Sequence, residues 1–227
     1  MRVLAVASQK GGSGKTTLTG HLAVAAERAG QGPVALIDCD PQGSLAAWWN
    51  ERRAETPLFA RSHLLGLRAD VEKMRGLGIQ LLFIDTPPAI TSMIKEVIQV
   101  ADLVVIPIRP SPHDLRAAAA TVEMVEYIGR PLVFVLNAAS ARARITGEAA
   151  VALSQHGTVA PVTLHQRTEF AASMIDGRTV MEVSRASQSA EEVGALWTYI
   201  DERLRRAARD ESAVAVAPPL VFGTRAP

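Results

Sequence analysis

One short stretch constrains this chain more than any other: residues 8–22 read SQKGGSGKTTLTGHL. Its glycine-rich core, Gly11 to Thr17, follows an apolar, strand-like run at residues 2–8 and precedes a helix-like run. Glycines permit backbone conformations that point successive N–H groups at one anion, and a following helix adds the positive end of its dipole. A strand, a glycine-rich turn and a helix in this order predict a phosphate-binding loop.

The rest of the chain alternates apolar, β-rich runs with amphipathic or alanine-rich stretches of helical length. Strands that are apolar on both faces, and that alternate with helices, indicate a parallel sheet covered on both sides. We therefore predict an α/β fold with a mostly parallel, twisted sheet flanked by helices on both faces. The predicted strands are residues 2–8, 33–38, 79–85, 102–108 and 131–137.

Length and composition limit the organisation of the chain. With 227 residues, of which 48% are hydrophobic and 21% charged, one buried domain over residues 1–209 is expected, followed by a mobile or surface-packed tail at 210–227. One cysteine excludes a disulfide within the chain, and the absence of a signal segment or of about 18 consecutive apolar residues predicts a cytoplasmic protein. A formal charge of +1 gives no overall attraction to nucleic acid, so binding to DNA would need a local patch.

The residues of the glycine-rich turn suit a nucleoside triphosphate. Lys15 is expected to reach the β- and γ-phosphates, and the Thr16 hydroxyl to bind Mg²⁺. The stretch departs from the usual G-x-x-x-x-G-K-[ST] pattern, because Ser8 or Gln9 stands where the first glycine belongs. A second lysine, Lys10, directly precedes the turn.

The stretch KGGSGKTT resembles the deviant Walker A box of the ParA/MinD family of P-loop ATPases. In that box a signature lysine replaces the missing upstream glycine. DCDPQGS at 38–44 and LLFIDTPP at 81–88 follow in the order typical of that family. PIRPSPHDLRAA at 107–118 and HQRTEFAASMIDGRTVME at 165–182 are similar to the short, ParF-like partition ATPases that lack an N-terminal helix-turn-helix. The resemblance covers roughly residues 1–208 and implies a P-loop NTPase fold, ATP and Mg²⁺.

Three aspartates follow predicted strands. Asp85 closes an apolar run, so it should lie at the carboxyl edge of the sheet and hold Mg²⁺ through water. Asp38 and Asp40 flank Cys39, and strand alternation points both carboxylates to one side, where a cation would offset their repulsion. The resemblance implies that Asp40 positions or activates the attacking water while Asp38 supports the metal shell. A helix cap is the alternative for either residue.

Lys10 lies on the outer lip of the loop, where it has difficulty reaching phosphates that its own chain already holds. The resemblance implies that it reaches the nucleotide of a second subunit, so that two ATP molecules lie between two chains and the homodimer depends on ATP. An ordinary exposed lysine is the alternative. Lys10, Lys15 and Asp40 are the expected catalytic residues.

Asn137 ends a predicted strand, where its amide could read the adenine edge or form a turn. Cys39 is interpreted as a small buried residue, and the histidines at 21, 63, 113, 156 and 165 show no metal-ligand spacing. The expected nucleotide-binding residues are Lys10, Gly11, Gly12, Ser13, Gly14, Lys15, Thr16, Thr17 and Asn137, and the expected Mg²⁺ site comprises Thr16, Asp38 and Asp85.

The end of the chain bears on the choice between DNA and a membrane as partner. A predicted last helix carries arginines with helical-neighbour spacing, and Pro218–Pro219 would break an interfacial anchor helix, so a membrane partner is disfavoured. A solvated helix face is the alternative to a DNA contact. The candidate DNA-binding residues are Arg167, by resemblance, and Arg203, Arg205, Arg206 and Arg209, by spacing.

These features, together with the family resemblance, predict a dimerising, Mg²⁺-dependent ATPase that binds DNA without sequence preference. The resemblance implies that such a protein is nucleoid-associated and positions a cargo, whether a plasmid, a chromosome origin or a protein cluster such as chemoreceptors, with a ParB-like or cargo-adaptor partner that stimulates hydrolysis. A MinD-like membrane ATPase, an amide-forming synthase on the same scaffold and a tyrosine kinase are the alternatives. The sequence selects neither the cargo nor the partner.

Overall fold

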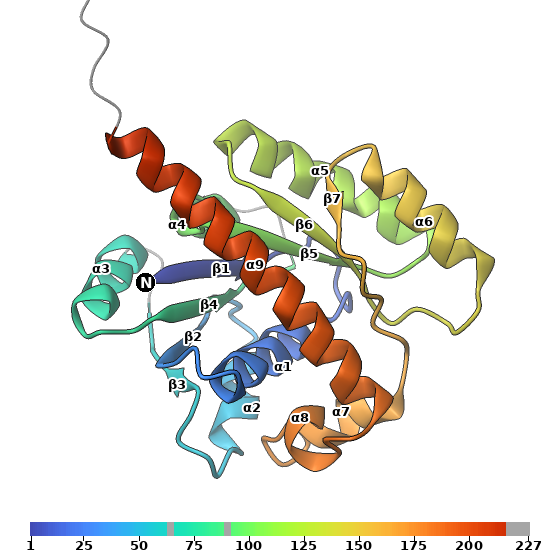
Figure 1. The fold of residues 1–227 in the computed structure, drawn as a ribbon, viewed down its shortest axis with the longest axis horizontal. Helices are drawn as coiled ribbons and strands as arrows, with labels where there is room; N and C mark the ends of the chain where they lie inside the picture. The colour runs from blue at the N-terminus through green and yellow to red at the C-terminus, as the bar shows by residue number, and fades with distance from the viewer. Residues whose placement is uncertain (63–65, 89–91, 217–227) are drawn as a thin grey trace, which may run out of the picture.

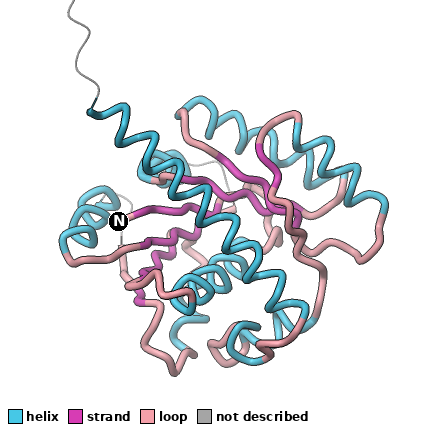
Figure 2. The backbone as a smooth tube through the Cα atoms, viewed as in Figure 1, coloured by secondary structure: helices cyan, strands magenta, loops and turns pink. Residues whose placement is uncertain are grey.

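The computed structural model describes residues 1–62, 66–88 and 92–216, with backbone alone for residue 92 and for 210–216. The described residues form one seven-stranded sheet in the order β3-β2-β4-β1-β5-β6-β7, and every strand pair is parallel (Figures 1 and 2). The strands are β1 (Arg2–Val6), β2 (Val34–Asp38), β3 (Leu58–Phe59), β4 (Leu81–Asp85), β5 (Leu103–Ile108), β6 (Leu132–Leu136) and β7 (Thr158–Val159).

Helices cover both faces of the sheet, and each face has its own apolar core. The first face packs α1 (Lys15–Arg28), α2 (Ser44–Asn50), α7 (Thr168–Met174), α8 (Val180–Val183) and α9 (Gln188–Val216). The second face packs α3 (Leu67–Gly76), α4 (Ser92–Val100), α5 (Pro112–Ile128) and α6 (Arg144–Ser154). Alternation along a strand divides its side chains between the cores: Leu4 and Val6 face the first, and Val3 and Ala5 the second.

All five predicted strands are confirmed, each one or two residues shorter than its apolar run. Two edge strands, β3 and β7, were not predicted, because each contains two residues and carries no periodic signal. The α/β fold with a parallel sheet and helices on both faces is therefore confirmed.

Strand register gathers the ends of three strands at one edge of the sheet. Asp38 of β2 aligns with Asp85 of β4, and Asp85 aligns with Val6 of β1, directly before the glycine-rich loop. Neighbouring strands lie about 4.8 Å apart, so two carboxylates and the start of the loop are close neighbours. Open parallel sheets bind ligands at this carboxyl edge.

Helix α9 is the C-terminal element of the described chain and lies beside α1 across the first face (Figure 1). It continues to Val216, past residue 209, where we expected the domain to end. The remainder of the expected tail, residues 217–227, lies outside the described residues, as does His63. Across the described ranges, none of the helices combines the length and apolar character needed to cross a bilayer.

Candidate nucleotide-binding site

The glycine-rich loop joins β1 to α1 and adopts conformations that need glycine. Gly12 and Gly14 have φ of 74° and 91°, in the left-handed region that residues with a Cβ rarely occupy. Gly14 is the N-cap of α1, where it offers no side-chain cap, and the first turn of the helix carries no acidic residue. The positive end of the α1 dipole is therefore open to an anion.

Lys15 and Thr16, the first residues of α1, connect the loop to the carboxylates at the strand ends. Lys15 is 7% exposed, and its Nζ donates a hydrogen bond to the Lys10 carbonyl at 3.4 Å. Burial lowers the pKa of Lys15, while the charges of Asp85 and Asp40 act in the opposite direction. Thr16 Oγ1 donates to Asp85 Oδ2 at 2.6 Å, which joins the hydroxyl and the carboxylate expected around Mg²⁺.

Asp85 is completely buried at the end of β4. Burial raises its pKa to about 7, an effect that the hydrogen bond from Thr16 opposes and that the neighbouring Asp38 reinforces. Burial also raises the pKa of Asp38. A cation at this edge would favour the ionised form of both groups.

The acidic loop after β2 is ordered by its own carboxylates. Asp38 accepts hydrogen bonds from the N–H groups of Asp40 at 2.9 Å and of Ala46, in α2, at 3.0 Å. Asp40 Oδ1 accepts from the Gln42 N–H at 3.0 Å. Asp38 thus holds the start of α2 and also lies beside Asp85. Its geometry is compatible with both interpretations made from the sequence, a helix cap and a residue that supports the metal shell.

Two cavities lie on either side of the loop and share Gly14 and Thr17. The larger, about 600 Å³, contains Lys15, Thr16 and Asp40. The smaller, about 200 Å³, lies beyond the ends of β5 and β6 and has a more apolar wall. Its lining residues include Arg109, Asn137, Leu164, His165, Arg167 and Phe170. Phosphates in the larger cavity and a nucleoside in the smaller would suit this division.

The donor set around the larger cavity fits Mg²⁺. Mg²⁺ prefers oxygen ligands and retains several waters, so one hydroxyl and one or two nearby carboxylates are sufficient when phosphates complete the shell. Thr16, Asp85 and Asp38 provide such oxygens. In the described ranges no cluster of three or more histidine, cysteine, aspartate or glutamate side chains offers a separate metal site.

Among the described residues, the hydrogen bonds of Lys10 are made by its backbone. Its N–H donates to Ser8 Oγ at 3.3 Å, and its carbonyl accepts from Lys15. The Lys10 side chain is exposed, directly before the first glycine of the loop. This placement leaves its ammonium group available to a molecule outside the chain.

Asn137 lies at the expected edge, but its amide contacts the loop. Asn137 Nδ2 donates to the Ser13 carbonyl at 2.7 Å, so the side chain supports the glycine-rich loop while it lines the smaller cavity. Sequence reasoning did not identify Arg109, whose exposed side chain follows β5 and lies beside Gly12. The sequence signal for Arg109 was its place directly after an apolar strand that ends at the same edge.

The structure separates the five candidate DNA-binding arginines. Arg167 lines the smaller cavity, and its guanidinium donates to Glu192 at 2.6 and 2.9 Å. The other four lie in the C-terminal half of α9, at residues 203–209, which places them about 17 to 25 Å beyond Glu192 along the helix at about 1.5 Å per residue. Arg167 therefore forms no single patch with them in one chain.

Cys39 and the described histidines show no nucleophilic or metal-binding arrangement. Burial raises the pKa of the half-buried Cys39 thiol to about 12, which makes it a poor nucleophile. His21 is buried inside the first core, and His165 pairs with Glu192 at 2.7 Å. His113 and His156 are exposed.

Comparison with known proteins gives the same assignment as the motifs. The profile of the CobQ/CobB/MinD/ParA nucleotide binding domain matches residues 4–194. "Maintenance of carboxysome distribution protein A" of Halothiobacillus neapolitanus is 28% identical over 198 residues, which span 82% of this chain and 90% of that protein.

Two solved structures have a similar fold. MinD of Pyrococcus horikoshii OT3, complexed with Mg-ADP, has a TM-score of 0.73 at 16% identity, covering 92% of this chain and 99% of its own. An McdA–ATP complex from Cyanothece has a TM-score of 0.67 at 16% identity, covering 92% of this chain and 96% of its own. With a parallel sheet, a glycine-rich loop before α1 and a profile match over most of its length, the chain belongs to the CobQ/CobB/MinD/ParA family of nucleotide-binding domains.

Proposed function

We propose that this protein is a Mg²⁺-dependent ATPase that forms a homodimer around two ATP molecules. The observation that carries the proposal is the division of roles between the two lysines. Lys15 is buried, which suits a residue that serves the nucleotide of its own chain, whereas the Lys10 side chain is exposed and available to a second chain. Complexes of similar folds with ATP and with Mg-ADP support the choice of nucleotide and metal.

The chain's own residues suggest a division of labour in hydrolysis. The loop N–H groups and Lys15 bind the phosphates. Thr16 and Asp85 would hold the cation, which would neutralise charge on the phosphates. Asp40, at the mouth of the larger cavity, orients the attacking water. Lys10 of each chain would stabilise charge that develops on the nucleotide of the other.

Light scattering with a slowly hydrolysed ATP analogue and Mg²⁺ tests the dimer. Wild type is expected to double its mass with the analogue and not with ADP, and Lys10→Ala to lose steady-state hydrolysis. Lys73→Ala removes another exposed lysine, on α3, and serves as the matched control. A wild type that stays monomeric with the analogue would refute the shared-nucleotide dimer.

We further propose that the ATP-bound dimer binds DNA through the C-terminal half of α9. Arg206 and Arg209 are exposed and make no hydrogen bond or ion pair with the described side chains. Arg206 and Arg203 line one depression of about 350 Å³, and Arg205 and Arg209 line another of about 450 Å³ on the other side of the helix. Exposed guanidinium groups of this kind contact phosphates without reading base sequence.

The cargo is proposed from the relatives. The Halothiobacillus protein is named for carboxysome distribution, which favours a protein assembly positioned over nucleoid DNA, and a relative from Rhizobium radiobacter is named ParA, a name associated with partition. In either case we propose a cargo-bound adaptor that stimulates hydrolysis. The family also includes CobQ and CobB, and the exposed Lys10 is what favours a positioning ATPase over an amide-forming synthase.

A further inference from the structure

Helix α2 connects the acidic loop to a second region of the protein. It has seven residues, too few to be stable without tertiary contacts, so its position depends on what holds its ends. At its start, Asp38 binds the Ala46 N–H, and the Gly43 N–H donates to the Asp40 carbonyl at 2.9 Å. The position of Asp40 is therefore tied to that of α2.

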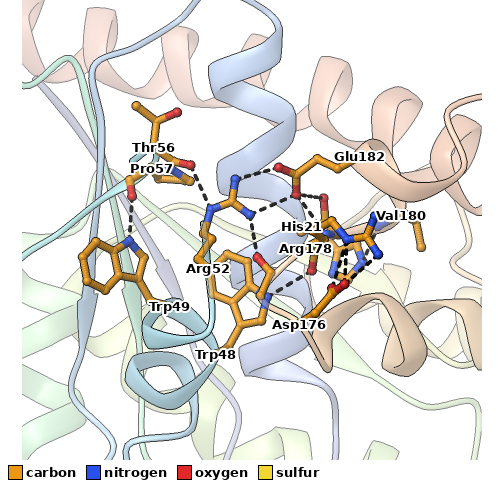
Figure 3. A network of polar contacts seen from close by, with 12 residues as sticks. His21, Trp48, Trp49, Arg52, Thr56, Pro57, Asp176, Arg178, Val180 and Glu182 are labelled. Atoms are coloured by element: carbon orange, nitrogen blue, oxygen red, sulfur yellow. Dashed lines mark hydrogen bonds and ion pairs between the residues drawn. The ribbon is translucent and has the colours of Figure 1, made fainter. Parts of the chain in front are cut away.

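The other end of α2 is held by Arg52, whose side chain is 3% exposed. Its Nη2 donates to Glu182 Oε1 at 2.7 Å and its Nη1 to Glu182 Oε2 at 3.0 Å, a bidentate pair (Figure 3). The same guanidinium donates to the carbonyls of Gly177 at 2.7 Å and Thr56 at 2.9 Å. Arg52 thus ties the end of α2 to the turn between α7 and α8.

The turn between α7 and α8 is built to receive this arginine. Gly177 has φ of 74°, and a Cβ there would lie 2.3 Å from the Arg52 backbone nitrogen, so the two backbones touch. Glu182 also accepts hydrogen bonds from the N–H and hydroxyl of Thr179, which forms a capping box at the start of α8. One carboxylate therefore holds both α8 and α2.

Trp48 extends the connection to the phosphate-side cavity. Its indole N–H donates to the Arg178 carbonyl at 3.1 Å, and the Arg52 guanidinium lies 5.3 Å from its ring centre (Figure 3). Trp48 lines the larger cavity together with Met174 of α7, and its ring lies against Gly20 of α1. The wall of the cavity and the Arg52–Glu182 pair are therefore one packed unit.

We infer that Arg52 and Glu182 are positioning residues for hydrolysis, which fix α2 so that Asp40 faces the attacking water. The inference rests on the proposed ATPase function. Nucleotide binding depends mainly on the loop between β1 and α1, which neither residue contacts, whereas hydrolysis needs the water placed to within about 1 Å. Loss of the pair should therefore reduce kcat much more than ATP affinity.

Two conservative variants test the pair in the full-length protein without DNA. Glu182→Gln keeps the shape but removes the charge, and Arg52→Lys keeps the charge but loses the bidentate fork. We expect kcat to fall about 10- to 100-fold in each variant, while the Kd for ATP changes by less than about threefold. The contribution of Trp48 to the ATP-induced fluorescence change is the part that is lost when Trp48 is replaced by Phe. This contribution should also be smaller in both variants.

The matched control is Asp201→Asn, at the opposite edge of the sheet. Asp201 forms ion pairs with Arg2 and Arg205, and the Asp201 and Arg2 side chains, 11% and 19% exposed, are largely buried, as are Glu182 and Arg52 at 19% and 3%. The control should lower the unfolding temperature by a similar amount and leave kcat within about twofold of wild type.

The possible outcomes separate the inference from the proposed function. A Glu182→Gln protein with a lowered unfolding temperature and an unchanged kcat would overturn the positioning role, as would an equal loss of kcat in Asp201→Asn. Equal weakening of ATP binding and turnover would also overturn it, because the effect would then lie in the site as a whole. A wild type that does not hydrolyse ATP would refute the proposed function itself.

Discussion

Replacement of His21 tests how burial controls the acid stability of the first core. The ring is 1% exposed on α1 and lies edge-on to Phe170 at a centroid distance of 5.2 Å. Its Nδ1 lies 2.8 Å from the Thr17 carbonyl, and its Nε2 accepts from the Val180 N–H at 3.3 Å. With an acceptor at one nitrogen and a donor at the other, the imidazole is neutral with its proton on Nδ1.

Burial lowers the pKa of His21 from 6.5 to about 4, against a smaller opposing effect of the Thr17 carbonyl. The unfolded chain therefore binds this proton at a higher pH than the folded chain does. Stability from His21 is fully present above pH 6.5 and is lost as the pH falls from 6.5 towards 4. At pH 5.0, about 1.5 units below the unfolded pKa, the loss is about 2 kcal/mol at about 1.4 kcal/mol per unit.

Urea unfolding at pH 7.5 and 5.0, without nucleotide, measures this loss. The free energy of unfolding of wild type should fall by about 2 kcal/mol more than that of His21→Gln, whose amide can make both hydrogen bonds but does not titrate. Other titrating groups are common to both proteins and cancel in the comparison. His156→Gln, which removes an exposed imidazole, is the matched control. Equal acid sensitivity of wild type and His21→Gln, within about 0.5 kcal/mol, would refute the reasoning.

Further substitutions address the loop and the proposed DNA surface. Gly14→Ala should weaken ATP binding and cost about 1–3 kcal/mol of stability, because φ is 91° and the new Cβ would lie 2.3 Å from Asn137 Nδ2. Titration calorimetry measures the affinity for ATP, and urea unfolding measures the stability. Wild-type values in both measurements would contradict the clash. Arg206→Glu combined with Arg209→Glu should abolish DNA retention of the ATP-bound dimer, whereas Arg167→Ala should have a smaller effect because Glu192 already binds that guanidinium. The single change Arg206→Ala should make the slope of log K for DNA binding against log salt concentration shallower by about 0.9 for each DNA phosphate that Arg206 neutralises in the wild type. If the Arg206→Glu, Arg209→Glu double variant retains DNA as well as wild type does, the DNA-binding surface lies elsewhere.

Much of the site was predictable because its signals are local in the sequence. A fully buried parallel strand is an apolar run, so the five long strands could be recognised from composition alone. The glycine-rich loop is a strand, a turn and a helix in immediate succession, and it fixes Lys15 and Thr16 without reference to the rest of the fold. Asp85 followed from the rule that open parallel sheets bind ligands at the carboxyl ends of their strands, whereas Asp38 followed from strand alternation and from the family resemblance.

Other features depend on contacts between residues that are distant in the sequence. Nothing near Asn137 indicates that its amide binds the Ser13 carbonyl, 124 positions earlier. Arg52 and Glu182 are 130 positions apart, and their pairing follows from how α2 and α8 pack against α1.

The arginines illustrate the same division between sequence and structure. Helical spacing predicted which arginines share the last helix, but it could not show that Arg167 is bound by Glu192 while Arg206 remains exposed. Sequence alone determined the fold class, the glycine-rich loop before α1 and the acidic strand ends, because these features depend on backbone propensity and apolar pattern in neighbouring residues. Tertiary structure decided which polar side chains are paired, buried or available to a partner, because those states depend on how the helices pack on the sheet.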